Sequence, residues 1–189
     1  MAESERPLRA HAQRSRAALL AAALKAFEAG EVGIRIEEIA GRAGVGVGTF
    51  YRHFATREAL VEAVYRRRVE DLCATAPRLL SAHAPYDALG AFLGQLIAHA
   101  AASAGMASVL ESLTTTRSEI FAQARAAMMD AVATIMAAGA EAGDIRADVA
   151  PETVFRAMGG VCTSHDQPDW EAGAHAVVRL VLDGLRPAR

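Results

Sequence analysis

The chain has 189 residues, enough for one or two small domains with a sizeable core. Alanine dominates, aromatic residues make up only 5%, and β-branched runs are almost absent, so the composition favours an all-α protein over any sheet-based fold. The net charge of −2 is unevenly distributed. Residues 1–68 carry 12 Lys and Arg against 8 Asp and Glu, whereas residues 69–189 carry 8 against 14.

Several classes of protein are disfavoured at once. The N-terminus is polar and charged, with no apolar run of the signal-peptide type, and we expect no segment to approach the roughly 20 apolar residues that cross a bilayer. The two cysteines, Cys73 and Cys162, have neither metal-ligand spacing nor the pattern of a disulfide framework. His165 and Asp166 lack a second cluster with which to hold a metal. We therefore expect a cytoplasmic protein without metal, cofactor or membrane partner.

The first strongly helical segment is SRAALLAAALKAFEAG. Its apolar residues recur at helical spacing from Ala17 to Phe27, and Gly30 is a stop signal, so we predict a helix over residues 12–27. The ten or so residues before it are predicted to be mobile. Four arginines in this region are interpreted as a solvated tail or, alternatively, as a basic arm that enters a DNA minor groove: Arg6, Arg9, Arg14 and Arg16.

The next segment, IEEIAGRAGVGVGTFYRHF, predicts two short helices joined by a tight turn. An apolar stripe begins at Ile36 and its spacing is repeated eleven residues later from Val47. Between the stripes, Gly44 can adopt the left-handed conformation that ends a helix, Val45 can fill the small core, and Gly46 can cap the second helix. Helices this short need a third helix to pack on. The pattern is typical of a helix-turn-helix that places its second helix in the DNA major groove.

A longer helix follows, beginning after Thr56, a favourable N-cap residue, and running through TREALVEAVYRRRVEDL. We place a domain boundary at its start, giving a helix-turn-helix domain over residues 12–56 and a larger helical domain over residues 57–187. The run Arg66-Arg67-Arg68 on this helix is interpreted as a solvated face, since most charge runs are.

The stretch VGIRIEEIAGRAGVGVGTFYRHFATREALVEAV closely resembles the N-terminal domain of TetR-family transcriptional regulators. The family motif combines Ile-Ala, Ala-Gly-Val, Gly-Thr-hydrophobic-Tyr-x-His/Tyr-Phe and a basic residue followed by Glu and Leu, and every part is present. The chain departs from it at Gly46, where the family often has Ser, and at Arg35, where it often has Thr. The resemblance implies an all-α fold, with a three-helix DNA-binding domain followed by a larger ligand-binding and dimerisation domain.

The candidate DNA contacts combine side chains that can bind phosphates with residues at the start of the second helix, where base edges are read. The resemblance implies a phosphate contact for Tyr51, although it also lies beside the apolar stripe. Val47 offers a thymine methyl only an apolar contact, and Gly48 lets the backbone approach closely. His53 can equally cap its helix. The full set is Arg35, Val47, Gly48, Thr49, Tyr51, Arg52, His53 and Arg57.

Five or six further helices are predicted beyond residue 84. One begins at Pro85 and ends near Gly105, a short one covers MASVLESL, and Thr114-Thr115-Thr116 interrupts it. Ser118 then caps a long helix that ends near Gly143. The last two helices begin at Pro151 and Trp170. The resemblance implies that they pair with their counterparts in a second subunit, whereas the plainer interpretation makes them ordinary core helices.

The ligand pocket is the least specific prediction. The resemblance implies that helices before the last two enclose it, but Met and Phe at helical spacing are also ordinary core residues. His99 is the one polar group in its apolar stretch, and it could orient a ligand or be a satisfied core histidine. The candidates are Phe92, Leu96, His99, Met106, Leu110, Phe121, Met128, Phe155, Met158 and Cys162.

Together these features predict a homodimeric regulator that binds double-stranded operator DNA, most simply a repressor released by a small apolar ligand. The basic excess of residues 1–68 coincides with the helix-turn-helix, as phosphate binding requires. No nucleophile–base pair, phosphate loop or metal cluster indicates an enzyme. The alternatives are an activator without a small-molecule inducer and a helical module that binds another protein.

Overall fold

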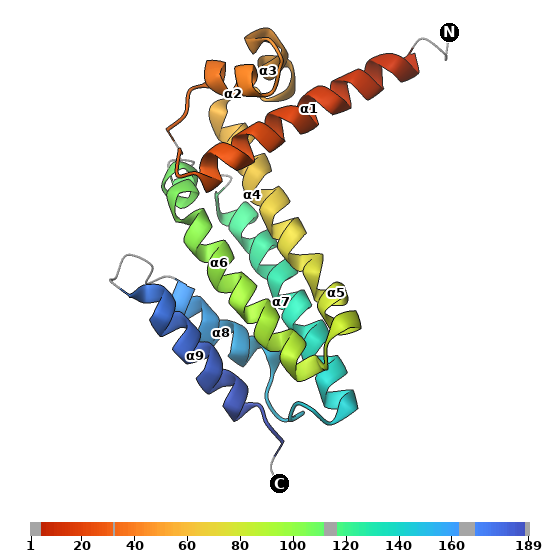
Figure 1. Cartoon of the computed structure of the whole chain (residues 1–189), viewed down its shortest axis with the longest axis vertical. Coiled ribbons are helices and arrows are strands. Elements are labelled where there is room, and N and C mark those ends of the chain that lie inside the picture. Colours follow the sequence, from red (N-terminus) through yellow and green to blue (C-terminus); the bar gives the residue numbers. More distant parts are fainter. Residues whose placement is uncertain (1–4, 32, 112–116, 163–168, 188–189) are drawn as a thin grey trace. The chain divides into compact units, whose positions relative to one another are not determined.

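The computed structural model describes residues 5–31, 33–111, 117–162 and 169–187, and within these ranges the chain forms nine α-helices (Figure 1). They divide into two compact units, residues 1–66 with 105–117 and residues 67–104 with 118–189. The helices are α1 (Glu5–Glu28), α2 (Ile36–Arg42), α3 (Val47–His53), α4 (Arg57–Cys73), α5 (Thr75–Ala82), α6 (Pro85–Glu111), α7 (Arg117–Ala142), α8 (Pro151–Cys162) and α9 (Trp170–Gly184). The all-α prediction is confirmed.

The first unit contains the predicted three-helix arrangement, with α1, α2 and α3 in mutual contact. Its core is made by apolar side chains of these helices and the start of α4, including Leu19, Phe27, Ile39, Phe50 and Leu60, each at most 3% exposed. Burial of these side chains compensates for the low intrinsic stability of two seven-residue helices.

The first helix begins earlier than predicted, since α1 starts at Glu5 and not near residue 12. Alanine and arginine are good helix formers, and Pro7 lies in the first turn, where its missing N–H has no helical acceptor to lose. Arg16 is also part of this helix, and its guanidinium carbon lies 5.3 Å from the centre of the Phe54 ring. It therefore stabilises the first unit by a cation–π contact.

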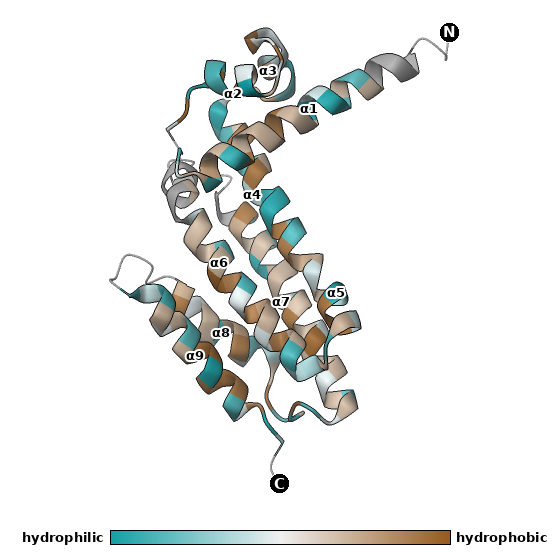
Figure 2. Cartoon of the chain, in the orientation of Figure 1, coloured by the Kyte–Doolittle hydropathy of each residue, from teal (hydrophilic) through white to brown (hydrophobic). Residues whose placement is uncertain are grey.

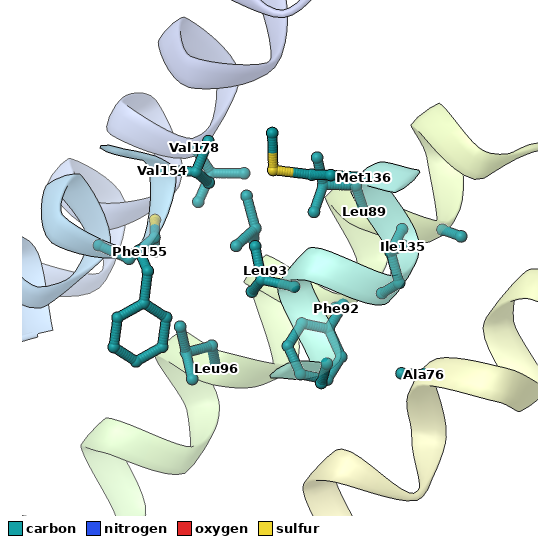
Figure 3. Packing of buried hydrophobic residues seen from close by; sticks show 14 of the residues in the cluster. Ala76, Leu89, Phe92, Leu93, Leu96, Ile135, Met136, Val154, Phe155 and Val178 are labelled. Atoms are coloured by element: carbon teal, nitrogen blue, oxygen red, sulfur yellow. The ribbon is translucent and has the colours of Figure 1, made fainter. Parts of the chain in front are cut away.

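The second unit has a continuous apolar core drawn from α4 to α9. Figure 3 shows Phe92 and Leu93 of α6 between side chains of α7 and α8, with Phe155 of α8 near Leu96. In Figure 2 the hydrophobic colours recur along α6, α7, α8 and α9. α8 and α9 pack on each other, and the Trp170 indole N–H donates a 2.6 Å hydrogen bond to the carbonyl of Val161.

Two helix boundaries differ from the predictions. α6 continues to Glu111, so the separate helix over MASVLESL is wrong; Gly105 alone does not end a helix flanked by alanines. α7 begins at Arg117, one residue before the predicted cap Ser118. The helix α5 was not anticipated. Thr114-Thr115-Thr116, His165 and Asp166 lie outside the described residues.

The expectation about apolar segments was too strict. Within the described ranges, Glu119–Ala142 of α7 is long and apolar enough to cross a membrane by length and composition alone. The core helix of a soluble protein passes the same test, so this is weak evidence for a span. Among the residues that the structure describes, no group of three or more His, Cys, Asp or Glu could hold a metal ion.

Candidate nucleic-acid interface

The turn between α2 and α3 has the predicted geometry. Gly44 has φ +68°, its N–H donates to the carbonyl of Gly41 at 3.1 Å, and the N–H of Val45 donates to the carbonyl of Ala40 at 3.0 Å. These two bonds form a Schellman motif, which ends α2 and satisfies its last carbonyls. Gly46 is the N-cap of α3, with an extended backbone and no side-chain cap. The turn thus fixes where α3 begins.

α3 separates a buried side from an outer side. Phe50 is fully buried and Phe54, just after the helix, is 3% exposed, with their ring centres 5.8 Å apart. Tyr51 packs edge-on against Phe50 at 5.3 Å but is 53% exposed. The aromatic pair therefore anchors the helix, while Tyr51 keeps its hydroxyl end outside the core.

The predicted DNA contacts on α3 all lie outside that core. Gly48, Tyr51 and Arg52 are exposed, while Val47, Thr49 and His53 are half-buried. At 100° per residue, Val47, Gly48, Tyr51 and Arg52 share one face of the helix, opposite Phe50. The structure brings these side chains together on one accessible surface, which we call the α3 face and define by those four residues with Thr49.

Two predicted contacts lie on neighbouring helices of the same unit. Arg35, the N-cap residue of α2, is exposed and its Nη2 lies 3.3 Å from Oε1 of Glu38. Such an exposed pair is weak, so a phosphate can replace the glutamate. Arg57, the first residue of α4, is half-buried and its Nη2 donates to the carbonyl of Ile34 at 3.4 Å. That bond holds it against the segment before α2.

The start of α4 is capped as predicted. The hydroxyl of Thr56 accepts a 3.2 Å hydrogen bond from the N–H of Ala59. The pKa of the Glu58 carboxyl is lowered by a hydrogen bond from its own backbone N–H and by one from Thr56. A further ion pair, 2.6 Å between Arg42 Nη2 and Glu31 Oε2, joins the end of α2 to the segment after α1.

The ligand-pocket candidates fall in several environments. Phe92, Leu96, Phe155 and Met158 belong to the core of the second unit, and Met128 packs against it. Met106 is 1% exposed, His99, Phe121 and Cys162 are half-buried, and the side chain of Leu110 lies outside the described residues. The pocket candidates predicted from sequence do not include two shielded polar residues of the second unit, Arg68 and Ser103. Arg68 stands in a charge run and Ser103 in an Ala-rich helix, so neither stands out by residue type. The sequence feature that could identify them is their position on the core-facing side of a helix.

Comparisons with known proteins agree with this geometry. Residues 19–64 match the family model for bacterial regulatory proteins of the tetR family, and residues 84–187, more than half of the chain, match the C-terminal domain of SbtR-like transcriptional regulators. A TetR transcriptional regulator from Streptomyces coelicolor, SCO0520, is 40% identical, with a TM-score of 0.77 over 92% of this chain and 99% of that one.

A TetR transcription regulatory protein from Mycobacterium vanbaalenii is 37% identical, with a TM-score of 0.74 over 96% of this chain and 100% of that one. FadR from Bacillus subtilis, 15% identical with a TM-score of 0.63 over 89% and 98% of the two chains, shares the fold. A comparison with curated proteins found no significant match. The chain belongs to the TetR family and is a DNA-binding transcriptional regulator, not an enzyme.

Proposed function

We propose that this regulator is a homodimeric repressor that occupies a palindromic operator and leaves it when a small ligand binds the second unit. Each subunit places α3 in one major groove, and the two-fold axis of the dimer sets the spacing of the half-sites. The observation that carries this proposal is the α3 face, an accessible surface rich in hydrogen-bonding groups, held by a buried aromatic pair.

The residues of the α3 face take different roles. Tyr51 and Thr49 donate hydrogen bonds to phosphates, while Arg52 is the main side chain for direct polar readout of bases. Val47 contacts a thymine methyl, and Gly48 lets the backbone approach the DNA. Arg35, His53 and Arg57 add phosphate contacts at the edges of this surface. Because few polar groups reach the bases, phosphate contacts and half-site spacing carry much of the recognition.

Dimerisation is proposed through α8 and α9. On α9, Ala174 and Val178 face the core of the same subunit, whereas Gly173, Val177, Leu180 and Gly184 form a second stripe at helical spacing. Leu180 is 72% exposed, one of two large apolar side chains on the described surface. A second copy of the pair α8–α9 would cover this stripe.

The dimer is tested by placing a charge on the stripe. Leu180→Glu should shift the protein from dimer to monomer in size-exclusion chromatography with light scattering, and operator binding should weaken with it. His175→Glu introduces the same side chain at an exposed position on another side of α9 and should remain dimeric. A Leu180→Glu variant that stays fully dimeric would exclude this interface.

Ligand release follows if the ligand favours a conformation in which the two DNA-binding units no longer match the half-sites. Adaptable side chains of the second unit, such as Met128 and Met158, support a ligand site there. The structure of FadR from Bacillus subtilis, a protein of the same fold, was determined with stearoyl-CoA bound. The α4 helix contributes residues to both units, so it is the proposed connection.

The direct test is a mobility shift on the DNA upstream of the protein's own gene, with shuffled DNA of equal composition as competitor. We expect sequence-selective, salt-sensitive binding by wild-type protein. Equal competition by the shuffled DNA would exclude an operator. Thermal melts against a broad set of small molecules test the ligand separately, since a ligand of the folded state raises the melting temperature.

A reporter assay distinguishes repressor from activator. Deleting the regulator should raise expression from the bound promoter; a fall would identify an activator, the alternative without an inducer. A cytoplasmic location follows from contact with DNA. If the helix-turn-helix binds another protein and not DNA, the mobility shift will show no salt-dependent binding to the operator.

A further inference from the structure

The three consecutive arginines of α4 have different environments. Nη2 of Arg66 lies 2.7 Å from Oε1 of Glu62, and Nη2 of Arg67 lies 2.8 Å from Oδ1 of Asp71, both as exposed ion pairs one turn apart. Arg68 is half-buried, and its Nη1 is shielded from solvent without a hydrogen-bond partner in the described part of the chain. The interpretation of all three as a solvated face is therefore wrong for Arg68.

Arg68 lies on the core-facing stripe of α4. Leu72, one turn later on the same side of the helix, is 7% exposed and belongs to the core of the second unit. The position four residues after a core-facing one continues the buried side, and so does the position four residues before it. The guanidinium is thus directed by helix periodicity toward the interior, while Arg67 is directed to solvent.

A matching polar stripe lies on α6. Phe92, Leu96, His99 and Ser103 recur at intervals of three and four residues, so they share one face. Ser103 is only 9% exposed, and its hydroxyl oxygen also has no hydrogen-bond partner among the described residues. His99 lies on the turn before Ser103, and its Nε2 is shielded from solvent.

The electrostatics connect the two stripes. Burial lowers the pKa of His99 to about 4, and the positive charge of Arg68 contributes to the shift. Leu72, one turn after Arg68, and Leu96, one turn before His99, belong to the same core cluster, so the two stripes face one interior. His99 is neutral at pH 7 and cannot balance the charge of Arg68. What remains is a positive, shielded site with two unused donors, the guanidinium Nη1 and the Ser103 hydroxyl.

A shielded guanidinium nitrogen without a hydrogen-bond partner is unfavourable, and a bound anion would supply that partner. A carboxylate fits this site because its two oxygens accept hydrogen bonds, and arginine–carboxylate bonds are short and strong. One guanidinium balances one negative charge, which favours a monoanion. Leu72, one turn after Arg68, and Leu96, one turn before His99, are apolar, so the remainder of such a molecule would meet an apolar surface.

We propose that the second unit binds a small organic monocarboxylate, with its carboxylate accepting hydrogen bonds from Nη1 of Arg68 and the hydroxyl of Ser103. The apolar remainder lies against the neighbouring apolar residues of α4 and α6. This inference rests on the proposed ligand response and narrows the ligand from an apolar molecule to one with a single carboxylate.

The test uses the full-length protein and four carboxylates: benzoate, phenylacetate, hexanoate and decanoate. Each is paired with its primary amide, which has the same shape but no charge. Thermal melts and calorimetric titrations should show that at least one carboxylate stabilises and binds the protein, while its amide does not. Equal effects of acid and amide, or no binding of any carboxylate, would overturn the proposal.

Variants then locate the site. Arg68→Met should weaken carboxylate binding about ten- to hundredfold, as expected for a lost charge-assisted hydrogen bond, and Ser103→Ala should weaken it less. Arg67→Met removes the same charge one residue away and should bind like wild type. Equal loss in Arg67→Met and Arg68→Met would contradict the assignment.

The melting temperature of Arg68→Met without any added carboxylate is a second test, which does not depend on the choice of carboxylate. Because Nη1 of Arg68 is shielded without a hydrogen-bond partner among the described residues, the melting temperature of Arg68→Met should be equal to or above that of wild type. A large fall would mean that Arg68 has an internal partner, and it would overturn the proposal. Arg68→Lys, which keeps the charge, should retain more binding than Arg68→Met.

The mobility shift separates this inference from the proposed function. If an amide releases the operator and its carboxylate does not, the ligand response stands and the carboxylate site is wrong. If carboxylates bind through Arg68 but never release DNA, the site stands and the ligand-responsive mechanism is wrong.

Discussion

The two units of the molecule differ in where their notable polar groups lie: those of the first project outward from its apolar core, and those of the second lie on the inner sides of its helices. In the first, Phe50 and Phe54 are buried while Tyr51 and Arg52 project outward from the same short helix. In the second, the exposed Arg67 is paired with Asp71, whereas Nη1 of Arg68, on the inner side of α4, has no hydrogen-bond partner among the described residues. An outward polar face suits a large partner such as DNA, while enclosed donors suit a small molecule that is surrounded by protein.

The largest expected effect concerns the buried side of α3. Phe50→Ala should destabilise the first unit by about 3–5 kcal/mol, because a fully buried ring leaves a cavity. Chemical denaturation followed by circular dichroism measures this change. Tyr51→Ala is the matched control. The Tyr51 ring is 53% exposed, so its removal should lower the free energy of unfolding much less. Similar losses for both variants would contradict the division of α3 into two sides.

The second prediction concerns the enclosed polar groups of the second unit. The pKa of His99 is lowered from 6.5 to about 4 by burial and by Arg68, so protonation favours the unfolded state between these values. The free energy of unfolding is therefore highest above about pH 6.5, where His99 is neutral in both states. It falls by about 3 kcal/mol as the pH falls toward 4 and the unfolded state takes up a proton on His99.

The pH effect is measured as the difference between wild type and His99→Gln in the free energy of unfolding at pH 7 and pH 4.5. The variant should lose less stability on acidification. Arg68→Met should raise the pKa of His99 and so reduce the acid sensitivity. If His99→Gln and wild type respond equally to pH, His99 is not held neutral by its surroundings.

A smaller effect compares two helical glycines of the second unit. A Cβ on Gly139 would lie 2.6 Å from Cγ1 of Ile145, a residue that is 2% exposed, so Gly139→Ala should destabilise the protein by about 1–3 kcal/mol. A Cβ on Gly94 meets nothing within 4 Å. Gly94→Ala should therefore stabilise α6 by up to about 1 kcal/mol. Thermal melts measure both, and equal signs would contradict the packing around Ile145.

The same contrast explains what could be predicted from sequence. The helix-turn-helix is specified locally: Gly44 sets the turn, Thr56 caps α4, and the apolar spacing selects Phe50 for the core. These features depend on a few neighbouring residues, so the motif carries them.

The second unit depends on which helices meet, which periodicity alone does not record. Gly105 was interpreted as a break although its alanine-rich neighbours continue α6, and Arg68 was grouped with two exposed arginines. Counting back one turn from Leu72 would have placed Arg68 on the inner side. The candidate DNA contacts and the pocket residues both remain predictions to be tested.

The central claim, that the α3 face holds operator DNA, is tested most directly by fluorescence anisotropy on the protein's own upstream DNA at several salt concentrations. Tyr51→Ala should weaken operator binding about ten- to hundredfold, as expected for a lost hydrogen bond to a charged phosphate, with little change in melting temperature. Lys25→Ala removes an exposed positive charge of α1 and should have a small effect. Unchanged operator affinity in Tyr51→Ala, or an equal loss in Lys25→Ala, would contradict the claim.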